Sequence, residues 1–189
     1  AVRSGAGHLI LTDQAQSEGR VAMPMILATS AVHSWLTRQG LRTFCSLNAR
    51  AAECIDPHYF AVLVGCGATT VNAYLAQDSI ADRIQRGLIE GTLTQAMARY
   101  RTAIDQGLLK IMSKMGISTV ASYRGAQIFE CIGLNHEVID KYFSRTASRV
   151  EGIGLDVISR EVKIRHDDAF KTREVENEAL DAGGVYQWR

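Results

Sequence analysis

Residues 42–74 read RTFCSLNARAAECIDPHYFAVLVGCGATTVNAY, and this stretch decides the fold class. Its first part, 42–48, is an apolar segment typical of a buried strand. Asp56 and Pro57 then predict a helix start, because aspartate caps the first N–H groups and proline suits the first turn. After a glycine turn, residues 70–74 predict another strand. Two strands joined by a helix favour parallel pairing within one sheet.

The same alternation of strands and helices extends over the rest of the chain. Further strands are predicted at 8–13 and 117–121, which makes four short strands in all. The spacing of apolar residues predicts helices at about 24–39, 57–65, 78–87, 93–115, 125–132, 136–143 and 155–170. We therefore expect an α/β fold, with an open, mostly parallel, Rossmann-like sheet flanked by helices and a helical C-terminal extension.

Composition narrows the possible classes of function. The chain has 189 residues, a hydrophobic content of 47% and a formal net charge of +1. That balance lacks the basic patch expected of a nucleic-acid-binding protein. No apolar run approaches the roughly 20 residues that span a bilayer, so we expect no membrane partner. The N-terminus lacks the pattern of a signal peptide, and a cytoplasmic location is the expectation.

Two regions are expected along the chain. Residues 1–150 contain the predicted sheet, and residues 151–189 contain a last helix followed by a polar linker at 171–184. The chain starts at Ala1 without an initiator methionine and ends with exposed-type aromatic residues at Tyr186 and Trp188. These features indicate that both ends are cut from a longer protein.

Cysteines, histidines and glycines give little support for metal or phosphate binding. The four cysteines form no C-x-x-C pair, so buried, reduced thiols are expected rather than a zinc site. No two histidines lie three or four residues apart, and we expect structural roles for them. The turn Gly65-Cys66-Gly67 follows a helix and precedes a strand. A phosphate loop needs the opposite order, so helix termination is favoured there.

The residues of greatest chemical interest lie in the segment 107–130, and two interpretations compete there. In the functional one, Lys114, Ser118, Tyr123 and Arg124 gather at the carboxyl end of a strand, where open α/β sheets bind ligands. In the structural one, the lysines are solvated and Arg124 pairs with Glu130 or with the following helix. From these residues alone the structural interpretation is favoured.

Several long strings then indicate a family. The chain resembles the large subunit of glutamate synthases over nearly its whole length, in the strings 5–13, 39–43, 58–61, 67–75, 110–118, 122–129, 149–155 and 183–189. Many such strings in the right order are far more specific than a single glycine motif. The resemblance implies that 1–150 is the later part of the central domain, and that 151–189 leads toward the FMN-binding barrel.

The resemblance also implies an activity for the parent protein. In this family one long chain combines a glutaminase domain, a central domain, an FMN-binding (β/α)8 barrel and a β-helix. Glutamine is hydrolysed, ammonia moves through an internal tunnel, and 2-oxoglutarate is reductively aminated on the flavin to give L-glutamate. FMN and an iron–sulfur cluster are thus implied for the parent chain, and the electron donor is left open.

No catalytic, cofactor-binding or metal-binding residue of the family can be placed on this segment. The glutaminase nucleophile is an N-terminal cysteine, whereas residue 1 here is Ala1. Cys45, Cys54 and Cys66 are too widely separated to match the closely spaced cluster ligands of the family. The isolated segment is therefore expected to be inactive.

The function expected for the segment is that of a scaffold. It would join the glutaminase and FMN-binding domains, and it would help to wall the ammonia tunnel. The residues predicted to form that interface are Ser113, Lys114, Ser118, Tyr123, Arg124 and Gln127. The alternative is a free-standing α/β module that binds a small anionic metabolite at the glycine turn or near Lys114 and Arg124.

Overall fold

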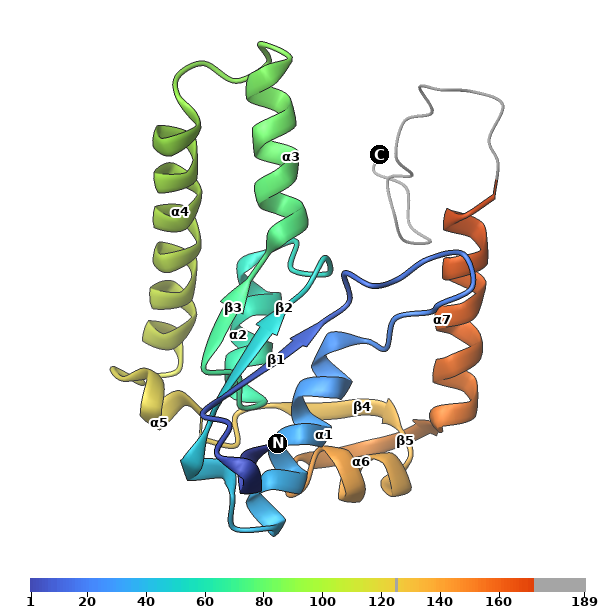
Figure 1. Ribbon diagram of the computed structural model, residues 1–189. Helices are drawn as coiled ribbons and strands as arrows, with labels where there is room; N and C mark the ends of the chain where they lie inside the picture. The colour runs from blue at the N-terminus through green and yellow to red at the C-terminus, as the bar shows by residue number, and fades with distance from the viewer. Residues whose placement is uncertain (125, 172–189) are drawn as a thin grey trace.

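The computed structural model describes residues 1–124 and 126–171, which form an α/β arrangement (Figure 1). The strands are β1 (His8–Thr12), β2 (Ser46–Arg50), β3 (Thr70–Asn72), β4 (Glu130–Leu134) and β5 (Ala147–Ile153). The α-helices are α1 (Met25–Arg38), α2 (Pro57–Gly65), α3 (Tyr74–Gln85), α4 (Leu93–Lys114), α5 (Val120–Arg124), α6 (His136–Tyr142) and α7 (Leu155–Ala169). Single 3₁₀ turns occupy Val2–Ser4 and Arg42–Phe44.

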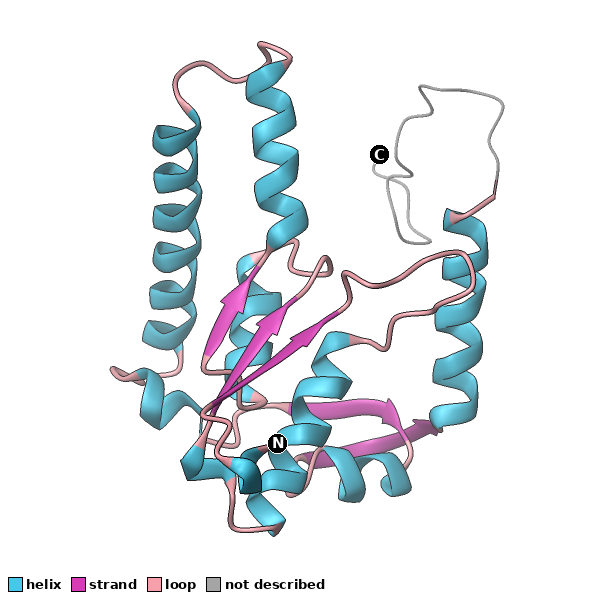
Figure 2. Cartoon of the chain, viewed as in Figure 1, coloured by secondary structure: helices cyan, strands magenta, loops and turns pink. Residues whose placement is uncertain are grey.

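The first sheet has the strand order β1-β2-β3, and both pairings are parallel. His8 lies opposite Ser46 and Asn48 lies opposite Thr70 in the register. Helices α1 and α2 connect successive strands and lie side by side behind the sheet, with α4 packed against α2 (Figure 2). The predicted α/β class, with parallel strands flanked by helices, is confirmed.

The other face of this sheet has no helix against it in the described part of the chain (Figure 2). Side chains there are mainly polar, and the Thr70 hydroxyl donates a hydrogen bond to Asn48 Oδ1 at 2.7 Å. Ile10 on the edge strand β1 is 65% exposed. Parallel sheets are normally covered on both faces, so half of the usual covering is missing from the described residues.

The prediction of one four-stranded sheet is wrong. β4 and β5 form a separate, two-stranded parallel sheet, in which Glu130 lies opposite Ala147. The helix predicted at 125–132 is also wrong, since its second half belongs to β4. The sequence pattern does not predict β5. Pairing between β4 and β5 decides the local structure here, and tertiary pairing of this kind commonly overrides local propensity.

The strand predicted at 117–121 is wrong for a local reason. Gly116 ends α4 with a φ of +69°, and the chain then turns into the short helix α5. The Thr119 hydroxyl accepts a hydrogen bond from the Ser122 backbone N–H at 3.3 Å, as an N-cap side chain does. A capping threonine thus outweighs the β-branched composition of this segment.

Most helix ends follow from the sequence signals. Asp56 Oδ1 accepts from the Tyr59 N–H at 2.9 Å and starts α2. Thr92 and Gln95 form a capping box that starts α4. Strand boundaries were less accurate, because 42–44 is a 3₁₀ turn before β2 and Tyr74 already belongs to α3.

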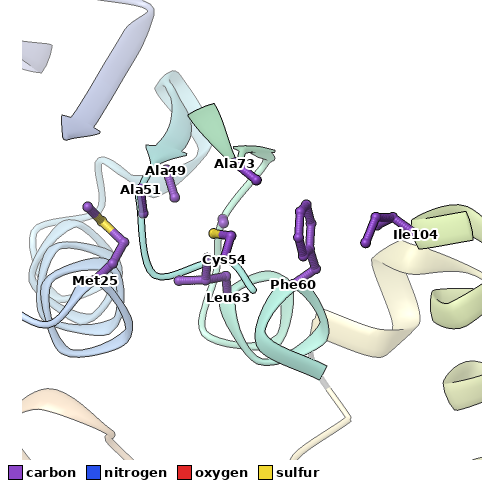
Figure 3. Packing of buried hydrophobic residues seen from close by; sticks show 9 residues of the cluster. Met25, Ala49, Ala51, Cys54, Phe60, Leu63, Ala73 and Ile104 are labelled. Carbon is purple, nitrogen blue, oxygen red and sulfur yellow. The ribbon is translucent and has the colours of Figure 1, made fainter. Parts of the chain in front are cut away.

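The main core lies between the first sheet and helices α1, α2 and α4 (Figure 3). Figure 3 shows Ala49, Ala51 and Ala73 above α2, with Phe60 and Leu63 pointing between the layers. The small alanine side chains allow α2 to approach the strands closely, which keeps this core dense. Burying Phe60 and Leu63 contributes about 1.5–3 kcal/mol each.

The C-terminal helix predicted at 155–170 is confirmed as α7. His166 on α7 is buried, and its Nε2 lies 3.1 Å from the Glu18 carbonyl oxygen. This helix therefore contacts the loop after β1. Except for Lys171, the linker predicted at 171–184 lies outside the described residues, and the division at residue 150 stays a prediction.

Gly67 offers a test of how tightly the turn between α2 and β3 is packed. Its φ is +113°, and an added Cβ would lie 2.3 Å from His33 Nδ1. We expect Gly67→Ala to lower the free energy of unfolding by roughly 2–4 kcal/mol, because left-handed strain and a steric clash add together. The measurement is urea denaturation followed by circular dichroism.

Gly40→Ala is the matched control for this test. Gly40 also has a positive φ, +66°, but no atom lies within 4 Å of an added Cβ. This variant should lose only about 1–2 kcal/mol, the cost of the left-handed conformation itself. Equal losses in the two variants would contradict close packing at Gly67.

Candidate functional site

A cavity of about 490 Å³ lies between the first sheet's helices and the second sheet. One wall comes from α1 and the end of α2, and the other comes from α5, β4 and the loop 143–146. The apolar part of its lining includes Ile26, Val62, Phe129, Ile132 and Leu134. This volume falls in the range of small-molecule sites, which are mostly apolar with a few placed polar groups.

The structure divides the six predicted site residues into two groups. Tyr123, Arg124 and Gln127 line the cavity. Ser113, Lys114 and Ser118 do not, and their side chains are exposed at the end of α4 and in the loop after it. The predicted gathering at the carboxyl end of a strand is wrong, because 117–121 contains no strand. The solvated position expected for Lys114 is confirmed.

Arg42 does not line the cavity but supports His33, which does, and sequence reasoning missed this role. Its Nε donates to His33 Nδ1 at 3.0 Å, and its two terminal nitrogens donate to the Cys45 and Gly67 carbonyl oxygens at 2.7 Å each. One side chain therefore joins α1, the start of β2 and the turn before β3. An arginine in a turn gives no local signal of such a role.

His33 lines the cavity in its neutral form. Burial lowers the pKa of this imidazole, and the charges of Arg42 and Arg124 lower it further. Because Arg42 donates to Nδ1, the ring proton lies on Nε2. The structural role expected for His33 is thus realised as an acceptor for Arg42.

Arg124 lies in the cavity wall without a partner. Its Nε is buried, and the side chain makes no hydrogen bond or ion pair with any residue in 1–124 or 126–171. The expected pair with Glu130 is not formed, since that carboxylate pairs with Arg149 at 3.6 Å. An unpaired, partly desolvated guanidinium is energetically costly.

Two hydroxyl groups of the cavity wall hold the second sheet in place. Ser30 and Ser34 both donate to the Tyr142 carbonyl oxygen, at 2.6 and 3.1 Å. Arg38 donates to the neighbouring Lys141 carbonyl at 3.0 Å. One face of α1 therefore fixes the end of α6, and with it the position of the β4–β5 unit.

The thiols of the cavity are poor nucleophiles. Burial raises the pKa of Cys66 to about 11, and burial also raises the pKa of Cys131. Both are free thiols. Because the thiolate is the reactive form, neither is activated at neutral pH. These two thiols therefore give no support for catalysis by a cysteine nucleophile.

Strained backbone marks the same cavity. Of the described non-glycine residues, Gln127 and Arg145 alone have a positive φ, at 50° and 66°. Both line the cavity. Residues held in this sparsely populated conformation tend to cluster at ligand-binding and active sites.

The described residues do not fit the iron–sulfur cluster implied for the parent chain. Such a cluster needs several thiolates close together, and no group of three metal-binding side chains occurs in the described ranges.

The same ranges contain no helix long and apolar enough to cross a membrane.

These features define an α/β unit with a partly basic cavity between two small parallel sheets. The model of the glutamate synthase central domain family matches residues 1–135. The chain belongs to that family. It is 55% identical over 190 residues to the large chain of glutamate synthase [NADPH] from Azospirillum brasilense, and 42% identical over 189 residues to that of Bacillus subtilis.

The relatives are much longer than this chain. Both alignments cover 100% of the chain but only 12% of the relative. Ferredoxin-dependent glutamate synthase 2 from Synechocystis is 41% identical over 183 residues, which is 89% of this chain and 12% of that protein. The likeness therefore concerns a limited part of each relative.

The lowered pKa of His33 predicts a pH dependence of stability. Below 6.5, the ordinary value, the unfolded state takes up a proton that the folded state resists. The free energy of unfolding should therefore fall as the pH drops from 7.5 to 5.5. The contribution has a slope of at most about 1.4 kcal/mol per pH unit, because one imidazole takes up at most one proton.

His33→Gln isolates this contribution. A glutamine amide oxygen can accept from Arg42 but does not titrate near neutral pH. Urea denaturation at several pH values should give a shallower slope for the variant, whatever its absolute stability. Identical slopes for the variant and the wild type would exclude His33 as the titrating group.

Proposed function

We propose that this chain is a structural segment of a glutamate synthase that makes L-glutamate from L-glutamine and 2-oxoglutarate. The observation that carries the proposal is the end-to-end similarity to 12% of the length of glutamate synthase large chains. In this role the segment joins the glutaminase and FMN-binding domains and helps to wall the ammonia path. It performs no chemistry itself.

The uncovered face of the first sheet supports a scaffold role. Parallel sheets are usually covered by protein on both faces, and in the described chain this sheet has helices on one face. Large apolar side chains exposed on the described surface also include Trp35, Phe44, Ile55 and Leu109.

The surface of segment 113–127 is the candidate wall of the ammonia path. Met115 and Val120 are exposed there, and the nearby residues Ser113, Lys114 and Ser118 in the sequence are exposed and polar. An apolar centre with a polar rim is the usual anatomy of a protein interface. Ammonia is retained only where such an interface excludes water, because water would let it escape or take up a proton.

The first test is the size of the native polypeptide that carries this segment. An immunoblot of source-cell extract with peptide mapping should show a band several-fold larger than 20.7 kDa. A band near 20.7 kDa would instead favour a free-standing module that binds an anionic metabolite.

Met115→Glu in the full-length protein tests the wall itself. Met115 is exposed in this chain, so the substitution leaves the segment's own core intact. Placing an unpaired carboxylate in the interface should loosen it, and more free ammonia should be released per glutamine consumed. We expect a several-fold rise, measured by comparing ammonia and glutamate formed with glutamine consumed.

Leu88→Glu is the matched control. Leu88 is similarly exposed, and the connection between α3 and α4 that contains it lies at the opposite end of α4 from α5 (Figure 1). The amount of free ammonia that this variant releases per glutamine consumed should match that of the wild type. Equal ratios for Met115→Glu and the wild type would mean that this surface does not wall the ammonia path.

A further inference from the structure

The unpaired guanidinium of Arg124 is the strongest unexplained feature of the cavity. Its Nε is removed from solvent and has no acceptor in 1–124 or 126–171. An arginine in this position normally pairs with a carboxylate or a phosphate, and its planar edge can donate two parallel hydrogen bonds. Because the Nε is closed to solvent, the donors that an anion can meet are the terminal nitrogens of Arg124, which form no hydrogen bond with a described residue.

Neighbouring charges favour an anion over a cation at this position. Arg42 adds positive charge behind His33, but its donors are already used on His33, Cys45 and Gly67. The acidic residue in the lining, Glu130, is opposed by Arg149. Arg124 thus has both the charge and the unused donors needed to bind a ligand.

The rest of the lining indicates an organic anion. Ile26, Val62 and Phe129 supply apolar surface, and Tyr123 packs edge-to-face on Phe129 with ring centres 6.1 Å apart. Inorganic phosphate would gain nothing from these walls, whereas a short hydrocarbon chain would be buried against them. Arg145 also lines the cavity but is exposed, so the guanidinium with a buried nitrogen is that of Arg124, and one such group matches a single carboxylate.

We propose that the cavity between the two sheets binds a small monocarboxylate, with its carboxylate on Arg124 and its apolar part against Phe129 and Ile26. Because the walls belong to α1 and α2 on one side and to α5 and β4 on the other, a bound ligand stabilises their mutual placement. Arg124 belongs to segment 113–127, but the site does not use the exposed side chains of Met115 and Val120, and it stands whether or not those side chains wall an ammonia path.

Hydrogen exchange with mass spectrometry on the full-length protein tests this site locally. The probe is butyrate, with chloride at equal ionic strength as the reference. Peptides covering α5 and β4 should exchange about tenfold more slowly when butyrate is present at ten times its Kd. Butyramide, which has the same shape but no charge, should give no protection. Absence of butyrate protection in the wild type would overturn the proposal.

Variants at Arg124 identify the residue that holds the carboxylate. Arg124→Gln should abolish the protection, whereas Arg83→Gln, an exposed control on α3, should retain it. If Arg124→Gln does not fold, Arg124→Lys decides, because it keeps the charge but loses the two-point geometry and should weaken protection at least several-fold. Full protection in a folded Arg124 variant, or equal protection by inorganic phosphate, would overturn the proposal.

Discussion

The arrangement of the first sheet depends on the three shortest of the four hydrogen bonds that Arg42 donates. This side chain binds the Cys45 carbonyl before β2, the Gly67 carbonyl before β3 and the His33 ring on α1. Each acceptor belongs to a different element, so one guanidinium fixes the strand entrances relative to the helix behind them. The approach of Gly67 to the His33 ring is a consequence, because no side chain fits between them.

Helix α1 also fixes the position of the second sheet. Its buried serines, Ser30 and Ser34, converge on one carbonyl oxygen at the end of α6. Those hydroxyls occupy the helix face next to His33, so the same helix serves both sheets. Two kinds of contact join the two units: the hydroxyl groups of α1, and an apolar cluster in which Ile128 and Phe129 pack against α2 and α5. Residues of both contacts border the cavity.

The parts of the fold that the sequence predicts are those decided by local chemistry. Asp56, Thr92 and Gly116 mark helix ends because capping and left-handed turns involve only neighbouring residues. β4 and β5 depend on a pairing between distant segments, with register shifts between Cys131 and Leu134, and no local pattern reveals it. The expected Arg124–Glu130 pair failed for the same reason, since β5 brings Arg149 to Glu130.

The candidate site shows that positive charge alone does not make a binding site. Arg42 and Arg124 both lie near His33 and both lower its pKa, yet their donors are used differently. Arg42 donates its hydrogen bonds to acceptors within the fold, and breaking these bonds would loosen the contacts among three elements. Arg124 has a buried Nε with no acceptor in the described chain. The hydrogen-bond partners of each guanidinium therefore distinguish a structural arginine from one available to a ligand. The sequence alone does not show these partners.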